Sequence, residues 1–210
     1  MNKGIFIVLD GPDGCGKTTQ AELLCAFLKA RNCDVLHIRE PGGTRIGEKM
    51  RDILLSPEHA EMAVTAELFL YMASRAQLVE EVIKPALLTG KIVISERFLS
   101  SSIVYQGIAG GLGKKNVEDA GRLACQGVKP DVIFILDIAA REGLVRIKRG
   151  LDRMESKQLT FHEQVRRGFL SLAKESPRNV KVIDSSGSIE QIHLQIRQFA
   201  GKLICRKGRK

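Results

Sequence analysis

The sequence predicts an α/β fold, with a five-stranded parallel sheet that carries helices on both faces. Short apolar runs rich in Ile and Val alternate with longer stretches of helical character. Strands covered on both faces are apolar throughout, and a helix normally makes the crossover between parallel strands. The expected strands are residues 5–9, 34–38, 92–95, 132–136 and 180–183, and the expected helices lie near 17–31, 45–55, 61–89, 114–127, 139–149, 160–175 and 188–204.

The first expected strand leads into a phosphate-binding loop. Residues 11–18 read Gly-Pro-Asp-Gly-Cys-Gly-Lys-Thr, a complete G-x-x-x-x-G-K-[ST] motif between a strand and a helix. The glycines let backbone N–H groups turn around phosphate oxygens, Lys17 reaches the β and γ phosphates, and the Thr18 hydroxyl is placed to hold Mg²⁺. The predicted ATP-binding residues are Gly11, Pro12, Asp13, Gly14, Cys15, Gly16, Lys17, Thr18 and Thr19.

Length and composition favour one soluble domain. The chain has 210 residues, which suits a domain over 1–204 followed by a basic tail at 205–210. Its apolar stretches are too short to cross a membrane, so we expect a cytoplasmic protein with no membrane partner. The five cysteines are odd in number and lack metal-ligand spacing, which indicates reduced, structural thiols.

The net charge of +9 raises the question of a nucleic-acid partner. Four of the positive charges lie in the last five residues. The few aromatic residues are not interleaved with basic ones, so we expect no nucleic-acid surface. Much of the remaining excess lies at positions that suit a small anionic substrate equally well, namely Arg39, Arg75, Arg97, Arg149 and Arg153.

Three segments interrupt the alternation of strands and helices. Residues 41–43 follow the second strand and the glycine-rich residues 100–113 follow the third, where an open parallel sheet binds its ligands. The glycine run itself is adequately explained as a solvated connector. Residues 149–157 interrupt a helical region and could close over the site as a lid.

The third strand ends in Glu96 and Arg97. P-loop enzymes place a carboxylate at a strand end beside the phosphate loop, where it organises Mg²⁺. A hydroxyl acceptor needs a carboxylate to take its proton, whereas a phosphate monoester, with a second pKa of about 6, is already anionic. Arg97 therefore favours a phosphate acceptor, because guanidinium groups grip phosphate oxygens. In the lid, Arg149 and Arg153 fit either transition-state stabilisation or a solvated turn paired with Asp152 and Glu155.

The motifs together resemble the thymidylate kinase family, P-loop nucleoside-monophosphate kinases that transfer the γ-phosphoryl group of ATP to dTMP. The resemblance covers residues 4 to about 156. It is carried by GPDGCGKTT at 11–19, REPGGT at 39–44, YMASRAQ at 71–77, ERF at 96–98, SSIVYQG at 101–107 and RGLDRME at 149–155.

The resemblance implies a role for each matching residue. Arg97 would grip the acceptor phosphate, Tyr71 would stack on thymine, Arg75 would donate to thymine O4, and Tyr105 would exclude a ribose hydroxyl. Ser102 would hydrogen-bond the base edge. The implied dTMP-binding residues are Asp13, Arg39, Pro41, Tyr71, Arg75, Arg97, Ser101, Ser102, Tyr105 and Gln106. The implied catalytic residues are Lys17, Arg97, Arg149, Arg153 and Asp13, and the implied Mg²⁺ ligands, partly through water, are Thr18, Asp13 and Glu96.

Within the family, a catalytic arginine lies either in the phosphate loop or in the lid. Position 14 is a glycine here, so the resemblance is to the bacterial type with lid arginines. The chain departs from the family at Glu96, where an aspartate is usual, and at Ser102, where bulkier hydrogen-bonding residues are common. A homodimer is also implied, through the long helix expected near 61–89.

Other classes remain as alternatives. Another nucleoside-monophosphate kinase, or a non-enzymatic nucleotide-switched binding protein, would carry the same phosphate loop. A GTPase is disfavoured because the sequence has no Asn-Lys-x-Asp motif. A deoxynucleoside kinase would need a carboxylate base where Arg97 stands.

Overall fold

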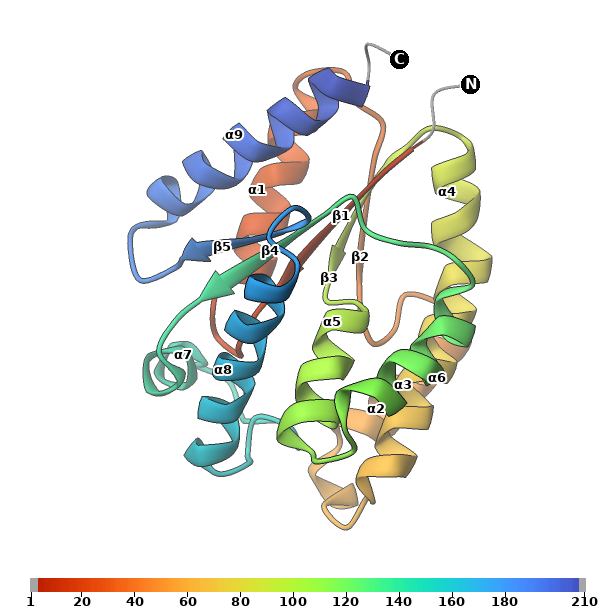
Figure 1. Cartoon of the computed structure of the whole chain (residues 1–210), viewed down its shortest axis with the longest axis vertical. Coiled ribbons are helices and arrows are strands. Elements are labelled where there is room, and N and C mark those ends of the chain that lie inside the picture. Colours follow the sequence, from red (N-terminus) through yellow and green to blue (C-terminus); the bar gives the residue numbers. More distant parts are fainter. Residues whose placement is uncertain (1–3, 208–210) are drawn as a thin grey trace.

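Five parallel strands form one sheet at the centre of the protein (Figure 1). The computed structural model describes residues 4–207, and within them the strand order is β2-β3-β1-β4-β5. The strands are β1 Ile5–Asp10, β2 Val35–Arg39, β3 Ile92–Glu96, β4 Val132–Asp137 and β5 Val180–Asp184. Every expected strand is confirmed to within one residue at either end.

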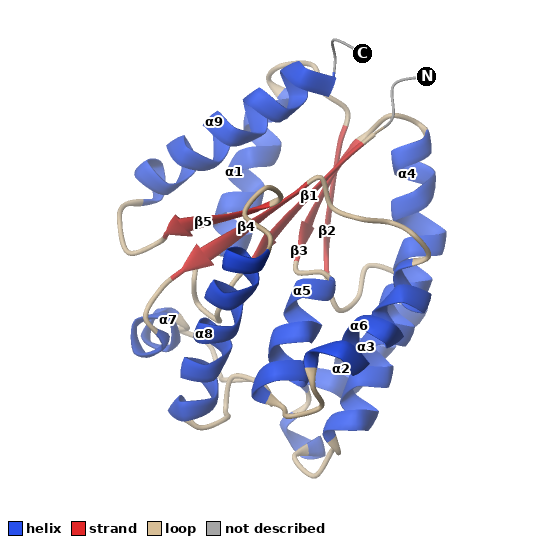
Figure 2. Cartoon of the chain, viewed as in Figure 1, coloured by secondary structure: helices blue, strands red, loops and turns tan. Residues whose placement is uncertain are grey.

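Helices cover both faces of the sheet (Figure 2). Strand side chains alternate between the two faces, so Ile7 packs in a cluster with Leu24 and Phe6 in another with Leu78. On the first face lie α1 Lys17–Lys29 and α9 Ile189–Lys207; on the second lie α4 Lys84–Leu88, α5 Leu99–Ser102 and α8 Leu159–Glu175. The remaining helices are α2 Arg45–Leu55, α3 Val64–Leu78, α6 Lys114–Cys125 and α7 Ala140–Arg146.

The glycine-rich segment at 100–113 is helical up to Ala109, so the expectation of an irregular segment was wrong there, whereas residues 110–113 form a turn that connects to α6. Helix α5 continues as a π-helix over Ile103–Ala109. Two glycines of the segment serve close packing: a Cβ on Gly107 would lie 3.2 Å from Val117 of α6, and one on Gly110 would lie 2.9 Å from Val64 of α3.

Other helix boundaries differ from the expected ones. The helix expected at 61–89 is α3 joined to α4 by a π-helical turn, Val79–Ile83. The helix expected at 139–149 ends at Arg146, so the loop before α8 begins earlier. Residues 205–207 of the expected tail continue α9, and residues 208–210 lie outside the described part. No helix between residues 4 and 207 has the length and apolar character to cross a membrane.

The register of the sheet gathers the chemically active residues. Leu9 of β1 and Arg39 of β2 both pair with Glu96 of β3, so these three strands end side by side. The phosphate loop follows β1, and Arg97 follows β3. The carboxyl edge of the sheet therefore carries every charged motif that the sequence placed at strand ends.

Candidate active site

A cavity of about 830 Å³ opens at this carboxyl edge. Its volume suits a nucleotide-sized ligand or larger. Of the predicted site residues, it is lined by Asp13, Gly14, Cys15, Gly16, Lys17, Thr18, Thr19, Arg39, Pro41, Tyr71, Arg75, Glu96, Arg97, Ser101, Ser102, Tyr105, Gln106 and Arg149. Gly11, Pro12 and Arg153 do not line it.

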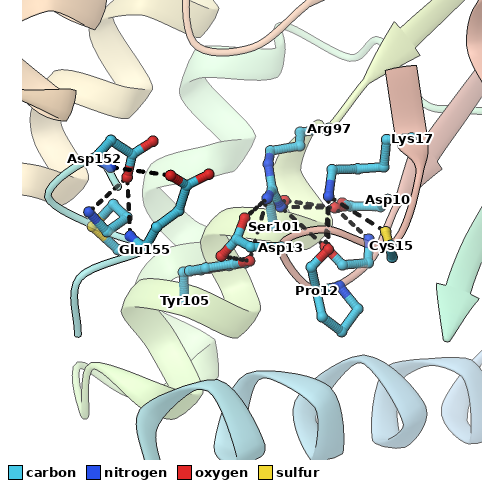
Figure 3. Close-up of polar contacts among 12 residues, drawn as sticks. Asp10, Pro12, Asp13, Cys15, Lys17, Arg97, Ser101, Tyr105, Asp152 and Glu155 are labelled. Atoms are coloured by element: carbon cyan, nitrogen blue, oxygen red, sulfur yellow. Dashed lines mark hydrogen bonds and ion pairs between the residues drawn. The ribbon is translucent and has the colours of Figure 1, made fainter. Parts of the chain in front are cut away.

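The phosphate loop has the backbone that its motif requires. Gly14 has φ 71° and Gly16 has φ 92°, and a Cβ on Gly14 would collide with the carbonyl of Gly143 in α7. Helix α1 begins at Lys17, so its free N–H groups face the cavity. Lys17 Nζ donates to the carbonyl of Pro12 at 2.8 Å and lies over its own loop (Figure 3).

Cys15 is buried inside the phosphate loop, in agreement with the expected structural thiol. Its side chain is 1% exposed, and Lys17 Nζ lies 3.4 Å from its Sγ. Burial raises the pKa of the Cys15 thiol above its ordinary value, although Lys17 and Arg97 oppose the shift. The thiol is therefore neutral at pH 7, which leaves it no role as a nucleophile.

Asp13, Arg97 and Tyr105 form a largely buried polar cluster, of which Tyr105 is buried and the other two are half-buried, where the phosphate loop meets the opposite wall of the cavity (Figure 3). Arg97 Nη2 donates to Asp13 Oδ1, and the Tyr105 hydroxyl donates to Asp13 Oδ2 at 2.8 Å. Burial alone would raise the pKa of Asp13, but the charges of Arg97 and Lys17 and the Tyr105 hydrogen bond outweigh it and hold the pKa below its usual value. The cluster thus presents an ionised carboxylate and a fixed guanidinium.

Arg97 is held in a conformation that is unusual for a residue with a side chain. Its φ is 68°, in the left-handed region, and its N–H donates to Leu9 O at 2.9 Å. Nη1 donates to Gly11 O at 3.2 Å and to Ser101 Oγ at 2.9 Å. Such strain is kept where the surroundings fix it, commonly at functional sites.

Asp10 is a site-shaping residue that the sequence reasoning missed. It is fully buried and accepts hydrogen bonds from Gly11 N at 2.9 Å and from the hydroxyls of Ser100 and Ser101, both at 2.6 Å. It thereby joins the end of β1 to the start of α5. The sequence signal that could have identified Asp10 is an aspartate at the end of an otherwise apolar strand.

Thr18 and Glu96 offer oxygen atoms of the kind that Mg²⁺ prefers. The Thr18 hydroxyl donates to Glu96 Oε2 at 2.6 Å, and His37 Nε2 lies 3.0 Å from Glu96 Oε1. Burial would raise the pKa of Glu96, but the hydrogen bonds from His37 and Thr18 lower it overall, so the carboxylate is ionised. The longer side chain of Glu96 therefore still reaches the phosphate loop. The sequence reasoning did not identify His37.

The third predicted metal ligand, Asp13, lies apart from this pair. Its carboxylate is engaged by Arg97 and Tyr105 rather than by Thr18 or Glu96. Within residues 4–207, no three His, Cys, Asp or Glu side chains are grouped to hold a metal ion. The residues present fit Mg²⁺ shared with nucleotide phosphates and water, which is its usual mode of binding.

Arg75 is buried on α3 and lines the cavity beside the Ser102 side chain. It is 1% exposed, so it is not a solvated charge on the surface of the helix. Its Nε donates to Glu40 Oε2 at 2.8 Å, and its Nη2 donates to Ser102 Oγ at 3.0 Å. Tyr71, one turn earlier, also lines the cavity. Glu40, the partner that makes this burial possible, was missed although it lies within the REPGGT motif.

The two lid arginines have different surroundings. The Arg149 side chain is 63% exposed, lines the cavity and pairs with both carboxylate oxygens of Glu155, at 2.8 and 2.7 Å. Arg153 is 5% exposed and lies 2.6 Å from Glu67 Oε2 on α3. The structure brings Arg149 to the cavity and does not bring Arg153 there.

The fold and the site define a P-loop α/β protein with a second, arginine-bearing compartment facing the phosphate loop. The profile of the family described as thymidylate kinase matches residues 9–196. A thymidylate kinase of Pelotomaculum thermopropionicum is 44% identical over 206 residues, which cover 96% of this chain and 95% of that protein. A thymidylate kinase of Thermoanaerobacter sp. strain X514 is 46% identical over 203 residues, covering 96% and 100%.

A solved structure agrees with these sequence matches. The crystal structure of thymidylate kinase from Ehrlichia chaffeensis has a TM-score of 0.79 and 31% sequence identity, and the match covers 94% of this chain and 99% of that one. The chain belongs to the thymidylate kinase family.

Proposed function

We propose that the protein transfers the γ-phosphoryl group of ATP to dTMP, giving ADP and dTDP, in the cytoplasmic synthesis of dTTP. The observation that carries the proposal is the position of Arg97. Its guanidinium lies between Asp13 of the phosphate loop and Tyr105 of the opposite wall. Two anionic nucleotides that met in this cavity would place their phosphates on either side of it.

The donor side needs charge neutralisation. The N–H groups at the start of α1 and the Lys17 ammonium would hold the ATP phosphates, with Lys17 exchanging its bond to Pro12 for phosphate oxygens. Thr18 and Glu96 would hold Mg²⁺, which neutralises charge on the β and γ phosphates.

The acceptor side needs positioning rather than a base, because a phosphate monoester is already anionic at pH 7. Arg97 would hold the acceptor phosphate in line with the γ phosphate. Arg149, exposed at the rim, would leave Glu155 and neutralise the charge that builds up during transfer.

The base and sugar would occupy the inner end of the cavity. Tyr71 would stack on thymine, and Arg75 with Ser102 would face its polar edge, because their mutual hydrogen bond already places donors there. Tyr105 is 6% exposed and held by Asp13, so it would leave little room for a 2′-hydroxyl. Gln106, also at the cavity wall, would complete the acceptor side.

We also propose a homodimer that forms through α3. Phe69 of α3 is 62% exposed and Leu123 of the adjacent helix α6 is 84% exposed. Large apolar side chains exposed on neighbouring helices favour a protein interface. Light scattering of the wild type and of Phe69→Asp tests it: a dimer in the first and a monomer in the second support the proposal, and a wild-type monomer contradicts it.

A panel of nucleoside monophosphates tests the activity. With ATP and Mg²⁺, we expect dTMP to turn over best and dUMP less well. Preference for AMP, CMP or GMP would indicate another nucleoside-monophosphate kinase. Nucleotide binding without turnover of any acceptor would indicate a nucleotide-switched binding protein.

A further inference from the structure

Glu67 of α3 is a buried carboxylate that touches the lid and the acceptor wall at once. It is 1% exposed. Its Oε1 accepts a hydrogen bond of 2.7 Å from Gln106 Nε2, and its Oε2 lies 2.6 Å from Arg153 Nη2. Lys157 Nζ lies 3.9 Å from the same oxygen. Because a buried charge is costly unless it is paired, these contacts hold one another in place.

Arg153 ties the second half of the lid to the body of the domain. Its Nε donates to Leu54 O at 2.8 Å, and its backbone N–H donates to Leu55 O at 3.1 Å, both in the last turn of α2. The next residue, Met154, is 5% exposed and packs in an apolar cluster of the core. Residues 153–157 are therefore built into the fold rather than forming a free flap.

The first half of the lid is exposed and connects to this fixed half through Glu155. The Glu155 side chain is 7% exposed, and both its oxygens hold Arg149. Asp152 Oδ1 accepts from the backbone N–H groups of Met154 and Glu155, each at 2.9 Å, which makes the turn rigid (Figure 3). The place of Arg149 is thus set by Glu155, and Glu155 directly follows the anchored Arg153 and Met154 in the same turn.

We propose that Glu67 is a positioning residue for phosphoryl transfer. It anchors residues 153–157 so that Arg149 is presented towards the phosphate loop. Through Gln106 the same carboxylate also orders the acceptor wall, so the lid and the acceptor compartment share one anchor. The inference rests on the proposed function of Arg149 in the transfer.

Glu67→Gln tests the anchor through kinetics. The substitution leaves Arg153 without its charge partner and frees the turn, so we expect kcat to fall at least tenfold. The KM for ATP should stay within twofold, because the phosphate loop is untouched. Glu80→Gln is the control: Glu80 is exposed and pairs with Lys84 at 2.9 Å, away from the cavity, and the variant should keep wild-type kcat.

Limited trypsin digestion gives a readout that does not depend on activity. In and just before the lid there are two exposed cleavage sites, after Lys148 and Arg149, a buried one after Arg153, and a half-buried one after Lys157. Wild type and Glu80→Gln should be cut first at the exposed pair. Glu67→Gln should also be cut after Arg153 and Lys157.

A double variant separates positioning from stability alone. Glu67→Gln/Arg153→Met replaces the ion pair with uncharged groups of similar size, and we expect its melting temperature to recover towards wild type. Its kcat should stay low and Lys157 should stay open to trypsin, because Met cannot bond to Leu54 O or to the residue at 67. Recovery of kcat together with the melting temperature would show that the pair only stabilises the fold.

The remaining outcomes distinguish the two proposals. A wild type that does not phosphorylate dTMP overturns the proposed function, while the trypsin pattern still tests the anchor. An active wild type with unchanged kcat and an unchanged trypsin pattern in Glu67→Gln overturns the anchor and leaves the function intact.

Discussion

Arg97, at the end of β3, pairs with Asp13, in the phosphate loop after β1. The two strands are neighbours in the sheet, so this contact is a direct consequence of the strand order. It fixes a guanidinium beside the phosphate loop, at the boundary that we propose between the donor and the acceptor nucleotides. The Asp13 carboxylate stays ionised, so an acceptor phosphate that binds Arg97 would compete with it for the guanidinium.

Arg97→Ala should weaken the acceptor site selectively. We expect a higher KM for dTMP and a kcat at least tenfold lower, because the acceptor phosphate loses its bidentate donor and its alignment. The KM for ATP should change less than twofold. Steady-state kinetics with each substrate varied in turn measure both effects, with Arg122→Ala, an exposed arginine of α6, as the control. Equal weakening of both substrates would contradict the assigned role.

Asp13 should make stability depend on pH in the acid range. Its folded pKa is lowered, so it stabilises the fold above its unfolded pKa of about 3.9, and this contribution is lost as pH falls through the folded pKa. Asp13→Asn cannot titrate. Urea unfolding from pH 7 to pH 3 should therefore show the wild-type advantage over this variant shrinking below about pH 4. An advantage that stays constant to pH 3 would rule out a depressed pKa.

The sheet could be predicted from the sequence because β1, β3 and β4 are nearly continuous apolar runs and β2 and β5 are still rich in Val, Leu and Ile. The helix over 99–109 could not, since its serines, Gly107 and the glycines that follow it resemble a loop. Gly107 and Gly110 allow close contacts with Val117 of α6 and Val64 of α3. The local sequence pattern does not reveal such contacts between separate helices.

The candidate site divides in the same way. The phosphate loop, Glu96 and Arg97 follow from motif and strand end, and the structure brings them together. The difference between Arg149 and Arg153 could not be predicted, because both lie in one short charged segment. Glu67, which buries Arg153, lies on a separate helix, and nothing in its neighbouring residues marks it as buried.

Arg149→Ala should impair catalysis and leave the fold intact. Because the Arg149 side chain is largely exposed and the buried Glu155 keeps the backbone N–H of Asp152 as a donor, we expect the melting temperature to change by no more than about 2 °C. The kcat should fall about 10²-fold or more, with both KM values nearly unchanged, if the contact forms mainly in the transition state. Arg141→Ala, an exposed arginine of α7, is the charge-matched control. Undiminished kcat in the Arg149 variant would remove the lid arginine from the mechanism.

Glu96 should set the Mg²⁺ requirement. Glu96→Gln keeps the shape but removes the charge that faces Thr18, so we expect the Mg²⁺ concentration for half-maximal rate to rise about tenfold or more. Glu96→Asp should show a smaller rise, because the shorter chain cannot reach both Thr18 and His37 as Glu96 does. Mg²⁺ titration of the rate at fixed ATP measures this, and Mn²⁺ binding with ADP, followed by electron paramagnetic resonance, repeats it without turnover. Glu22→Gln, an exposed position on α1, should behave as wild type. If Glu96→Gln kept the wild-type dependence on both metals, the ion would have to be held by the phosphates, Thr18 and water without this carboxylate.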